Sequence, residues 1–217
     1  MIVDERMVTF INSMELPEDK LLEEIEKEAL DSFVPIIRTE TKSLLKVLLT
    51  LKRPMRILEA GTAVGYSALV MSAYAPEGSK ITTIENYEKR IPIARANFAR
   101  AGKESNITLI EGDALEVMKG LAEPFDFIFM DAAKGQYIHY LPEVMRLLAP
   151  GGLLISDNVL QDGDVINSRF AVERRNRTIH SRMREYLFEL KHRKDLETTI
   201  LPVGDGVALS VRTERKI

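Results

Sequence analysis

The sequence predicts an α/β fold, in which helices cover both faces of a mostly parallel sheet. Three observations support this prediction. Short apolar runs alternate with stretches of helical periodicity, a pattern typical of parallel strands joined by helices. A glycine turn, Gly61 to Gly65, follows the first apolar run and leads into a helical stretch, as at the start of a nucleotide-binding βαβ unit. The length of 217 residues suits one domain of this class.

The segment before the sheet is predicted to be helical. Residues 39–51 form an amphipathic pattern, and Pro54 ends it before the first strand. We therefore expect a single domain over residues 1–217, with a helical extension over 1–53 and the core over 54–217. An earlier apolar stripe at helical spacing consists of Leu21, Leu22, Ile25, Ala29, Leu30 and Phe33.

From residue 56 onward, strands and helices alternate. The first five strands are joined by helices and are therefore expected to run parallel. Seven strands are predicted in all, at residues 56–59, 80–84, 107–110, 125–130, 153–156, 198–202 and 207–211. Helices are predicted at residues 67–75, 88–101, 113–120 and 137–148, and a long helix from Arg169 to about His192.

Composition and charge exclude several classes of protein. The chain has no cysteine, so it forms neither disulfides nor thiolate metal sites. No apolar run approaches the roughly 20 residues needed to span a bilayer, and residues 1–6 lack the apolar core of a signal peptide. With 45% hydrophobic and 29% charged residues, the composition is typical of a soluble protein. We expect a cytoplasmic protein that makes no membrane contact.

The residues around the glycine turn indicate a cofactor. Glu59 lies two residues before Gly61, and the two turn glycines are four residues apart, which resembles motif I of S-adenosylmethionine (SAM)-dependent methyltransferases rather than a dinucleotide fingerprint. Glu85 ends the second strand, where an acid can accept both ribose hydroxyls. Asp113 and Ala114 follow the third strand, where the methyltransferase plan places adenine, although Asp113 equally suits a helix N-cap. We expect these residues to bind SAM.

Oxygen-bearing side chains follow the next two strands. Asp131 comes directly after the fourth strand, and Asp157 and Asn158 follow the fifth. Neighbouring strands lie about 4.8 Å apart and end at one edge of the sheet, so these oxygens are expected to converge there. An all-oxygen set favours a hard ion such as Mg²⁺. Taken singly, each residue also suits a helix cap or a turn.

Three segments carry a more specific resemblance. Residues 131–137 (Asp-Ala-Ala-Lys-Gly-Gln-Tyr), 157–160 (Asp-Asn-Val-Leu) and 202–206 (Pro-Val-Gly-Asp-Gly) resemble the metal-dependent O-methyltransferases of the catechol and caffeoyl-CoA type, within a likeness from Val34 to Val211. The resemblance implies a Rossmann-like class I methyltransferase fold with one antiparallel strand, and a homodimer. It implies Mg²⁺ ligands at Asp131, Asp157 and Asn158, and SAM contacts at Ile37, Ser67, Glu85, Asp113, Ala114 and Asp131.

The same resemblance assigns a role to Lys134. Catechol-type enzymes place a lysine near the reacting hydroxyl at this position, three residues after the first metal-binding aspartate. Lys134 would then be a general base or a charge partner for the oxyanion. A solvated loop lysine is the alternative.

An excess of basic residues near the C-terminus bears on the substrate. Although the net charge is −3, residues 169–194 hold nine Arg or Lys and three Glu. Such a cluster favours phosphate contacts, predicted here at Arg174, Arg175 and Arg177. With residues 34–37 (Val-Pro-Ile-Ile), this stretch makes the chain most similar to the bacterial tRNA 5-hydroxyuridine methyltransferases, which implies a tRNA partner, bound at its anticodon region, and 5-methoxyuridine as the product.

Two other functions stay open at this stage. In the first, the enzyme methylates a small catechol or phenolic thioester, and the basic helix meets a soluble anion such as coenzyme A. In the second, the protein binds RNA on a degenerate methyltransferase scaffold. The intact metal-binding residues and the intact glycine turn count against this non-enzymatic reading.

Overall fold

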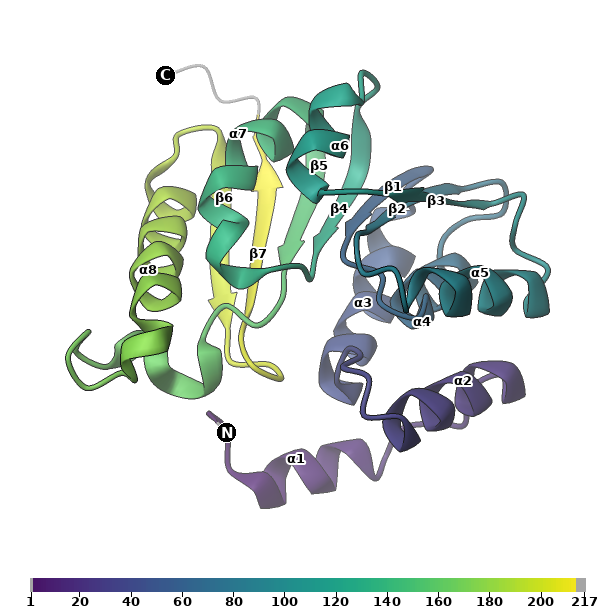
Figure 1. Cartoon of the computed structure of the whole chain (residues 1–217), viewed down its shortest axis with the longest axis horizontal. Helices are drawn as coiled ribbons and strands as arrows, with labels where there is room; N and C mark the ends of the chain where they lie inside the picture. The colour runs from purple at the N-terminus through teal and green to yellow at the C-terminus, as the bar shows by residue number, and fades with distance from the viewer. Residues whose placement is uncertain (1, 214–217) are drawn as a thin grey trace.

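The computed structural model describes residues 2–213, in which seven strands form one sheet with helices on both sides (Figure 1). The strand order is β3-β2-β1-β4-β5-β7-β6, and β7 alone runs in the direction opposite to the other strands. This arrangement confirms the predicted α/β class and the single antiparallel strand. The strands are β1 (Arg56–Ala60), β2 (Lys80–Glu85), β3 (Ile107–Glu111), β4 (Phe125–Met130), β5 (Leu148–Ser156), β6 (Leu196–Leu201) and β7 (Val207–Arg212).

Eight α-helices surround the sheet in the part of the chain that the structure describes. Their bounds agree with most of the predicted ranges to within a few residues, because apolar periodicity and the breaks at Gly and Pro mark them. The helices are α1 (Glu5–Asn12), α2 (Lys20–Asp31), α3 (Thr39–Lys52), α4 (Tyr66–Tyr74), α5 (Ile91–Arg100), α6 (Ala114–Gly120), α7 (Tyr137–Leu147) and α8 (Arg177–His192).

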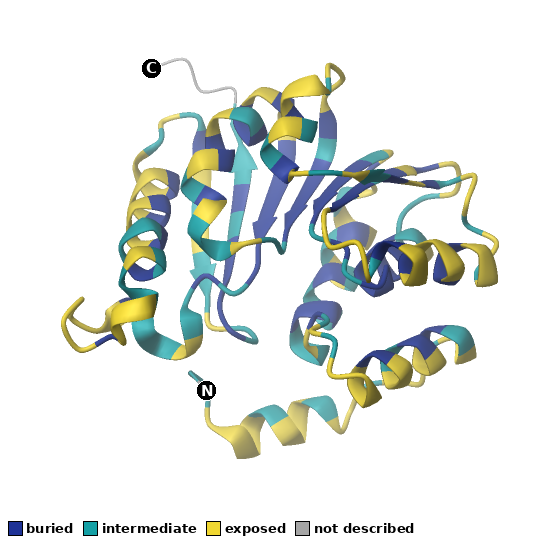
Figure 2. Ribbon diagram, viewed as in Figure 1, coloured by how far each residue is buried: buried dark blue, intermediate teal, exposed yellow. Residues whose placement is uncertain are grey.

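Alternate residues of the central strands enter two separate hydrophobic cores. Leu58 and Ile128 pack with side chains of α6, α7 and α8 on one face, whereas Ile57 and Phe127 pack with α2, α3, α4 and α5 on the other. A strand directs successive side chains to opposite faces, so a strand buried on both sides is a continuous apolar run. Figure 2 shows these strands buried along most of their length.

The N-terminal extension differs from the prediction in two ways. Phe33 does not belong to the apolar stripe of α2, because that helix ends at Asp31 and Phe33 has φ +54° and is 95% exposed. The sequence reasoning also missed α1, which Asp4 caps by accepting a hydrogen bond from the Arg6 N–H. This helix has no buried residue and lies at the margin of the molecule (Figures 1 and 2).

Two clusters of Lys, Glu and Tyr side chains join the extension to α4. Lys42 Nζ lies 3.1 Å from both Glu26 Oε2 and the Tyr66 hydroxyl, and that hydroxyl donates to the same glutamate oxygen. One turn further along α3, Lys46 pairs with Glu18, which also accepts a hydrogen bond from Tyr74. Through these contacts α3 is joined to both ends of α4, at Tyr66 next to the glycine turn and at Tyr74.

The long helix predicted from Arg169 is wrong in its first part. α8 begins at Arg177, and the chain before it forms two short 3₁₀ helices, Gln161–Ile166 and Arg174–Asn176, separated by irregular backbone. The predicted fifth strand is also longer than expected, since β5 begins at Leu148 and continues through Gly151 and Gly152. Among the described residues, no helix is long and apolar enough to cross a membrane.

Candidate functional site

The glycine turn after β1 brings two loops into contact. Gly61 has φ +92° and Gly65 has φ +86°, conformations that favour glycine. A Cβ atom on Gly61 would overlap the backbone carbonyl of Asp131, and one on Gly65 would lie 2.6 Å from a ring carbon of Phe98. The turn therefore needs glycine at both positions, and it holds the loops after β1 and β4 against each other.

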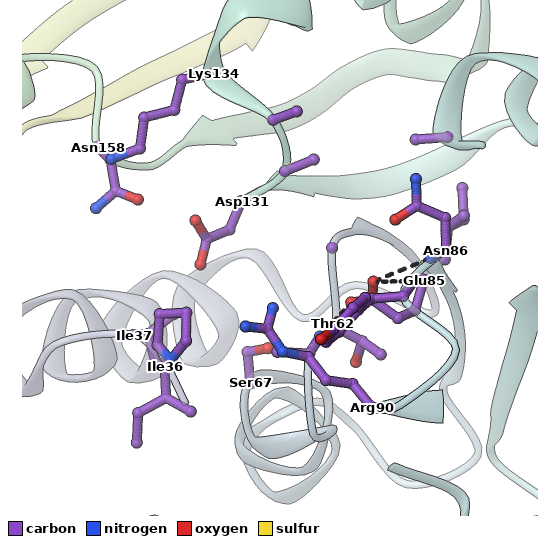
Figure 3. A pocket seen from close by; sticks show the side chains of 18 of the residues that line it. Ile36, Ile37, Thr62, Ser67, Glu85, Asn86, Arg90, Asp131, Lys134 and Asn158 are labelled. Atoms are coloured by element: carbon purple, nitrogen blue, oxygen red, sulfur yellow. Dashed lines mark hydrogen bonds between the residues drawn. The ribbon is translucent and has the colours of Figure 1, made fainter. Parts of the chain in front are cut away.

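A pocket of about 480 Å³ opens beside this turn (Figure 3). It lies at the carboxyl ends of the central parallel strands, the edge where α/β sheets bind their ligands. Most of the residues predicted from the sequence line this one cavity, although they come from widely separated segments of the chain. The predicted residues on its wall are Ile37, Gly61, Ser67, Glu85, Ala114, Asp131, Lys134 and Asn158.

Glu85 is fixed at the pocket wall by backbone hydrogen bonds. One of its carboxylate oxygens accepts the Ala63 N–H at 2.8 Å, and the other accepts the N–H groups of Asn86 and Tyr87 at 3.0 and 2.9 Å. These donors orient the carboxylate and leave about one of its four lone-pair sites for a ligand. Its place at the end of β2 is the one predicted for a ribose-binding acid.

Glu59 and Asp113 do not line the pocket. Glu59 is fully buried beneath it and accepts hydrogen bonds from the Ser67 and Thr83 hydroxyls. Desolvation raises the pKa of its carboxyl group to about 7. Asp113 caps α6 by accepting from the N–H groups of Leu115 and Glu116, which is the alternative reading of this residue. Its neighbour Ala114 reaches the pocket instead.

Asp131, Asp157 and Asn158 lie on two adjacent strand ends, as predicted. β4 and β5 pair in parallel with Met130 opposite Ser156, and the Asp157 N–H donates to Met130 O at 2.9 Å. Asn158 has the left-handed φ of +57°, a strained conformation that is typical of functional positions. Asp157 is 1% exposed, and its Oδ1 accepts the Asn158 N–H and, at 3.5 Å, the Thr41 hydroxyl.

The chemistry of this oxygen set suits a divalent cation. Burial raises the pKa of the Asp131 carboxyl and that of Asp157, and the negative charge of Asp131 raises the pKa of Asp157 further. The two desolvated carboxylates repel each other, with the Lys134 charge only partly offsetting them, and together with an amide oxygen they form a hard donor set. Among the described residues, no cluster of three or more His, Cys, Asp or Glu side chains offers an alternative metal site.

Lys134 approaches the same region from a short 3₁₀ helix, Lys134–Gln136. Its Nζ lies 3.6 Å from Asp205 Oδ2. Asp205 is 4% exposed, and its other oxygen accepts the Asp162 N–H. The 202–206 turn is thus joined to the loop that follows Asn158, and Lys134 is held by a buried carboxylate rather than being a free loop lysine. Sequence reasoning missed this pairing, because residue spacing does not report contacts across the fold.

Tyr137 does not shape the pocket surface. It is fully buried, and its hydroxyl donates to the backbone oxygens of Met130 and Asp157, which fixes the two strand ends relative to each other. The cavity wall includes other residues that the sequence did not reveal. Arg90, five residues after Glu85, extends its side chain into the pocket (Figure 3), and Tyr140 lines it from α7.

The arginines predicted to contact phosphate are dispersed rather than aligned on one helix face. Arg174 and Arg175 lie in the 3₁₀ turn before α8 and are exposed, and Arg175 pairs with Glu173 at 2.7 Å. The Arg177 guanidinium donates to the backbone oxygens of Val172 and Phe170, at 3.2 and 3.3 Å. Arg177 therefore has a structural role in closing the loop, and nucleic-acid binding by these residues stays a prediction.

Sequence comparison matches nearly the whole chain to one family. The family, described as O-methyltransferase, matches residues 12–213. A catechol O-methyltransferase from Niastella koreensis is 37% identical over 127 residues, which are 57% of this chain and 58% of that enzyme. Caffeoyl-CoA O-methyltransferase 2 from Populus trichocarpa is 34% identical over 182 residues, covering 77% of this chain and 71% of its own length.

Comparison of structures gives the same result. An O-methyltransferase from Bacillus cereus, solved in complex with SAH, superimposes with a TM-score of 0.84 and 27% identity. The match covers 94% of this chain and 96% of that one. The likeness therefore includes both the sheet and the helices that surround the pocket.

Proposed function

The chain belongs to the O-methyltransferase family and is a SAM-dependent enzyme of the catechol and caffeoyl-CoA type. From this premise we propose that it methylates one of two adjacent oxygens on a small aromatic substrate, with Mg²⁺ as the metal. The observation that carries the proposal is a pair of carboxylates at adjacent strand ends, Asp131 on the pocket wall and the buried Asp157 beside it. The names of the relatives also favour a small phenolic acceptor over tRNA.

The pocket provides a place for each part of the cofactor. Glu85 is the acceptor for the ribose hydroxyls, and Ala114 lies where adenine would pack. Ser67, Gly61 and Ile37 surround the opposite end, next to Asp131, and would hold the methionine part. Glu59 acts through Ser67, because it accepts that hydroxyl hydrogen bond from below the pocket floor.

Asp131, Asp157 and Asn158 are the residues that would hold the metal. When bound, Mg²⁺ lowers the pKa of a coordinated phenolic hydroxyl and fixes its position relative to the methyl donor. The chain contributes the rest by geometry. The Tyr137 hydroxyl ties the strand ends that carry the two aspartates, and the Thr41 hydroxyl restrains Asp157. This fixed arrangement lowers the entropic cost of aligning the acceptor oxygen.

Lys134 is the charged group beside the acceptor oxygen in this proposal. Its ion pair with Asp205 holds the ammonium group in place, where its charge would stabilise the negative charge that develops on the acceptor oxygen. The Asp205 carboxylate also restrains the flexible side chain. Between the two roles left open by the sequence, the ion pair supports the charge partner.

A tRNA substrate is the second candidate. The exposed arginines 174 and 175, outside the pocket, are the observation that favours it, since phosphate contacts need accessible cations. Under this hypothesis the acceptor is the 5-hydroxyl of uridine beside its C4 carbonyl, a chelating pair that the same residues would hold.

The deciding experiment compares acceptors with labelled SAM and purified protein. We expect methyl transfer to a catechol or a caffeoyl thioester, dependent on Mg²⁺, and none to tRNA that carries 5-hydroxyuridine. Transfer to the tRNA alone would replace the first proposal by the second. Methyl transfer that persists in excess chelator would contradict the metal requirement in both proposals.

A variant isolates the metal site from the cofactor site. Asp157→Asn should abolish methyl transfer and weaken binding of Mn²⁺, used as a spectroscopic probe, while the affinity for SAM stays within a few fold. The reason is that Asp157 is absent from the pocket wall. Unchanged Mn²⁺ affinity in this variant would remove Asp157 from the metal site.

A further inference from the structure

A second cavity, of about 390 Å³, lies between the first turns of α8 and the irregular segment before them. None of its residues lines the cofactor pocket. We propose that this cavity binds a phosphate monoester. Its lining is basic and polar and contains no acid: Asn167, Ser168, Arg169, His180, Ser181 and Arg184.

Two guanidinium groups give the cavity its charge. Arg184 is held in place because its Nη1 donates to Val165 O at 2.9 Å, which leaves its other N–H groups available. Arg169 belongs to the exposed segment on the opposite wall. Within residues 2–213, no carboxylate forms an ion pair with either arginine. The planar guanidinium matches phosphate oxygens in bidentate geometry, and the two positive charges suit an anionic phosphate group.

His180 distinguishes a monoester from other anions. Its Nε2 lies 3.1 Å from Asn167 O, so this nitrogen carries the proton and donates to the carbonyl. In the neutral ring the other nitrogen, Nδ1, is an acceptor, and it is buried without a hydrogen-bond partner. A phosphate monoester has a second pKa of about 6 and carries an O–H group in its singly protonated form. That group satisfies Nδ1, whereas a phosphodiester or a sulfate has no proton to give.

The position of the cavity relates it to the main site. One side of α8 packs against the 134–136 turn, where the Arg182 guanidinium donates to Gly135 O at 3.1 Å. Other residues of the same helical turns line the cavity. A ligand there would sit beside the helix that supports Lys134.

The test is a calorimetric titration of inorganic phosphate into the full chain, at constant ionic strength set with NaCl. We expect saturable binding by the wild type and at least about tenfold weaker binding by the double variant Arg169→Gln, Arg184→Gln, since a hydrogen bond to a charged group is worth roughly ten- to a hundredfold. Arg95→Gln is the matched control, because it removes an exposed arginine from α5, which lies across the sheet from α8 (Figure 1). Its affinity for phosphate should equal that of the wild type.

Further arms separate the possible anions. Arg169→Gln alone keeps the test open should the double variant fail to fold, since Arg169 makes no hydrogen bond that the described structure depends on. We expect a phosphate monoester to compete with inorganic phosphate for the cavity. Dimethyl phosphate and sulfate should compete poorly. Equal competition by sulfate would overturn the monoester assignment. The site would be overturned if phosphate did not bind or if the arginine variants bound phosphate like the wild type. It would also be overturned if these arginines mattered for binding of single-stranded RNA but not of phosphate.

Discussion

At the scale of single residues, the site depends on side chains that touch one another rather than the ligand. Thr41 donates to Asp157, Asp205 pairs with Lys134, and Glu59 accepts from Ser67. Each of these contacts fixes the orientation of a residue that the pocket or the proposed metal requires. Side chains that hold a ligand-binding residue in this way affect the position of that residue and its affinity for the ligand, although they do not contact the ligand themselves.

Gly61→Ala tests how closely the loops after β1 and β4 must approach. The new Cβ would overlap the Asp131 carbonyl, and alanine is strained at φ +92°, so we expect SAM affinity to fall at least about tenfold, with lower stability. Calorimetry with SAH would measure the affinity. Gly102→Ala is the matched control, because Gly102 also has a positive φ (+61°) but open space around a Cβ. Equal SAH affinity in both variants would show that the contact with Asp131 is unimportant.

Glu59→Gln tests the buried carboxyl beneath the pocket. Its pKa is raised from 4.5 to about 7, so the folded state holds the proton more tightly than the unfolded state. Stability should therefore fall as the pH rises from about 4.5 to 7 and then level off, by about 3 kcal/mol at roughly 1.4 kcal/mol per pKa unit. Urea unfolding at pH 5.5 and 8 should show about 2 kcal/mol of this loss in the wild type and a smaller loss in the variant. Parallel pH profiles would contradict the buried, protonatable carboxyl.

At the scale of elements, the sequence predicted the regular helices and strands and failed at the irregular segment. The central strands are continuous apolar runs, and the helices between them carry a clear stripe, so their positions follow from the pattern. Residues 161–176 contain the turn at Asp162 and Gly163 and few apolar residues, and local periodicity does not fix their course. The start of α8 was therefore placed eight residues early, at Arg169 instead of Arg177.

The same reasoning applies to the candidate site. Asp131, Asp157 and Asn158 could be placed together from sequence, because each directly follows a strand and strand ends share one edge of a parallel sheet. Arg90 and Asp205 could not, because each meets the site through loops whose paths depend on packing. Residues that are one step from a strand end are predictable in this fold, and residues that act across two loops are not.

A pair of leucines on α3 tests the packing of this helix. Leu49 is 0% exposed and Leu51 is 75% exposed. Leu49→Ala should lower the free energy of unfolding by about 2–5 kcal/mol, because it removes buried methyl groups and leaves a cavity. Leu51→Ala should change it by less than about 0.5 kcal/mol. Denaturant unfolding of both variants would check this, and similar losses in the two would mean that α3 packs by another face.

At the scale of the whole molecule, the apolar surface is uneven. Five large apolar side chains of α1 and the residues after it are about half exposed or more: Met7, Phe10, Ile11, Met14 and Leu16. Exposed apolar patches on a soluble protein often mark sites of protein–protein contact. The homodimer implied by the family resemblance stays a prediction, and α1 is the surface that we propose for it.

Light scattering after size exclusion tests this assembly. The wild type should have twice the mass of one chain, and the double variant Phe10→Ser, Met14→Ser should have the mass of one chain, because the change removes apolar area from the proposed contact. Ile93→Ser on α5, also an exposed apolar residue, should leave the dimer intact. A wild-type protein that is monomeric at micromolar concentration would exclude the prediction.

The strand order has a consequence for how the protein is made. β7 follows β6 in the chain but lies between β5 and β6 in the sheet. While the ribosome is still adding residues before 207, β5 has an unpaired edge, and unpaired strand edges are prone to intermolecular association. The Leu160 and Val159 N–H groups also lack their acceptors in the 205–206 turn until then. A nascent chain therefore fixes the loop after β5 only once residues 205–212 are available, when insertion of β7 closes both the edge and this loop.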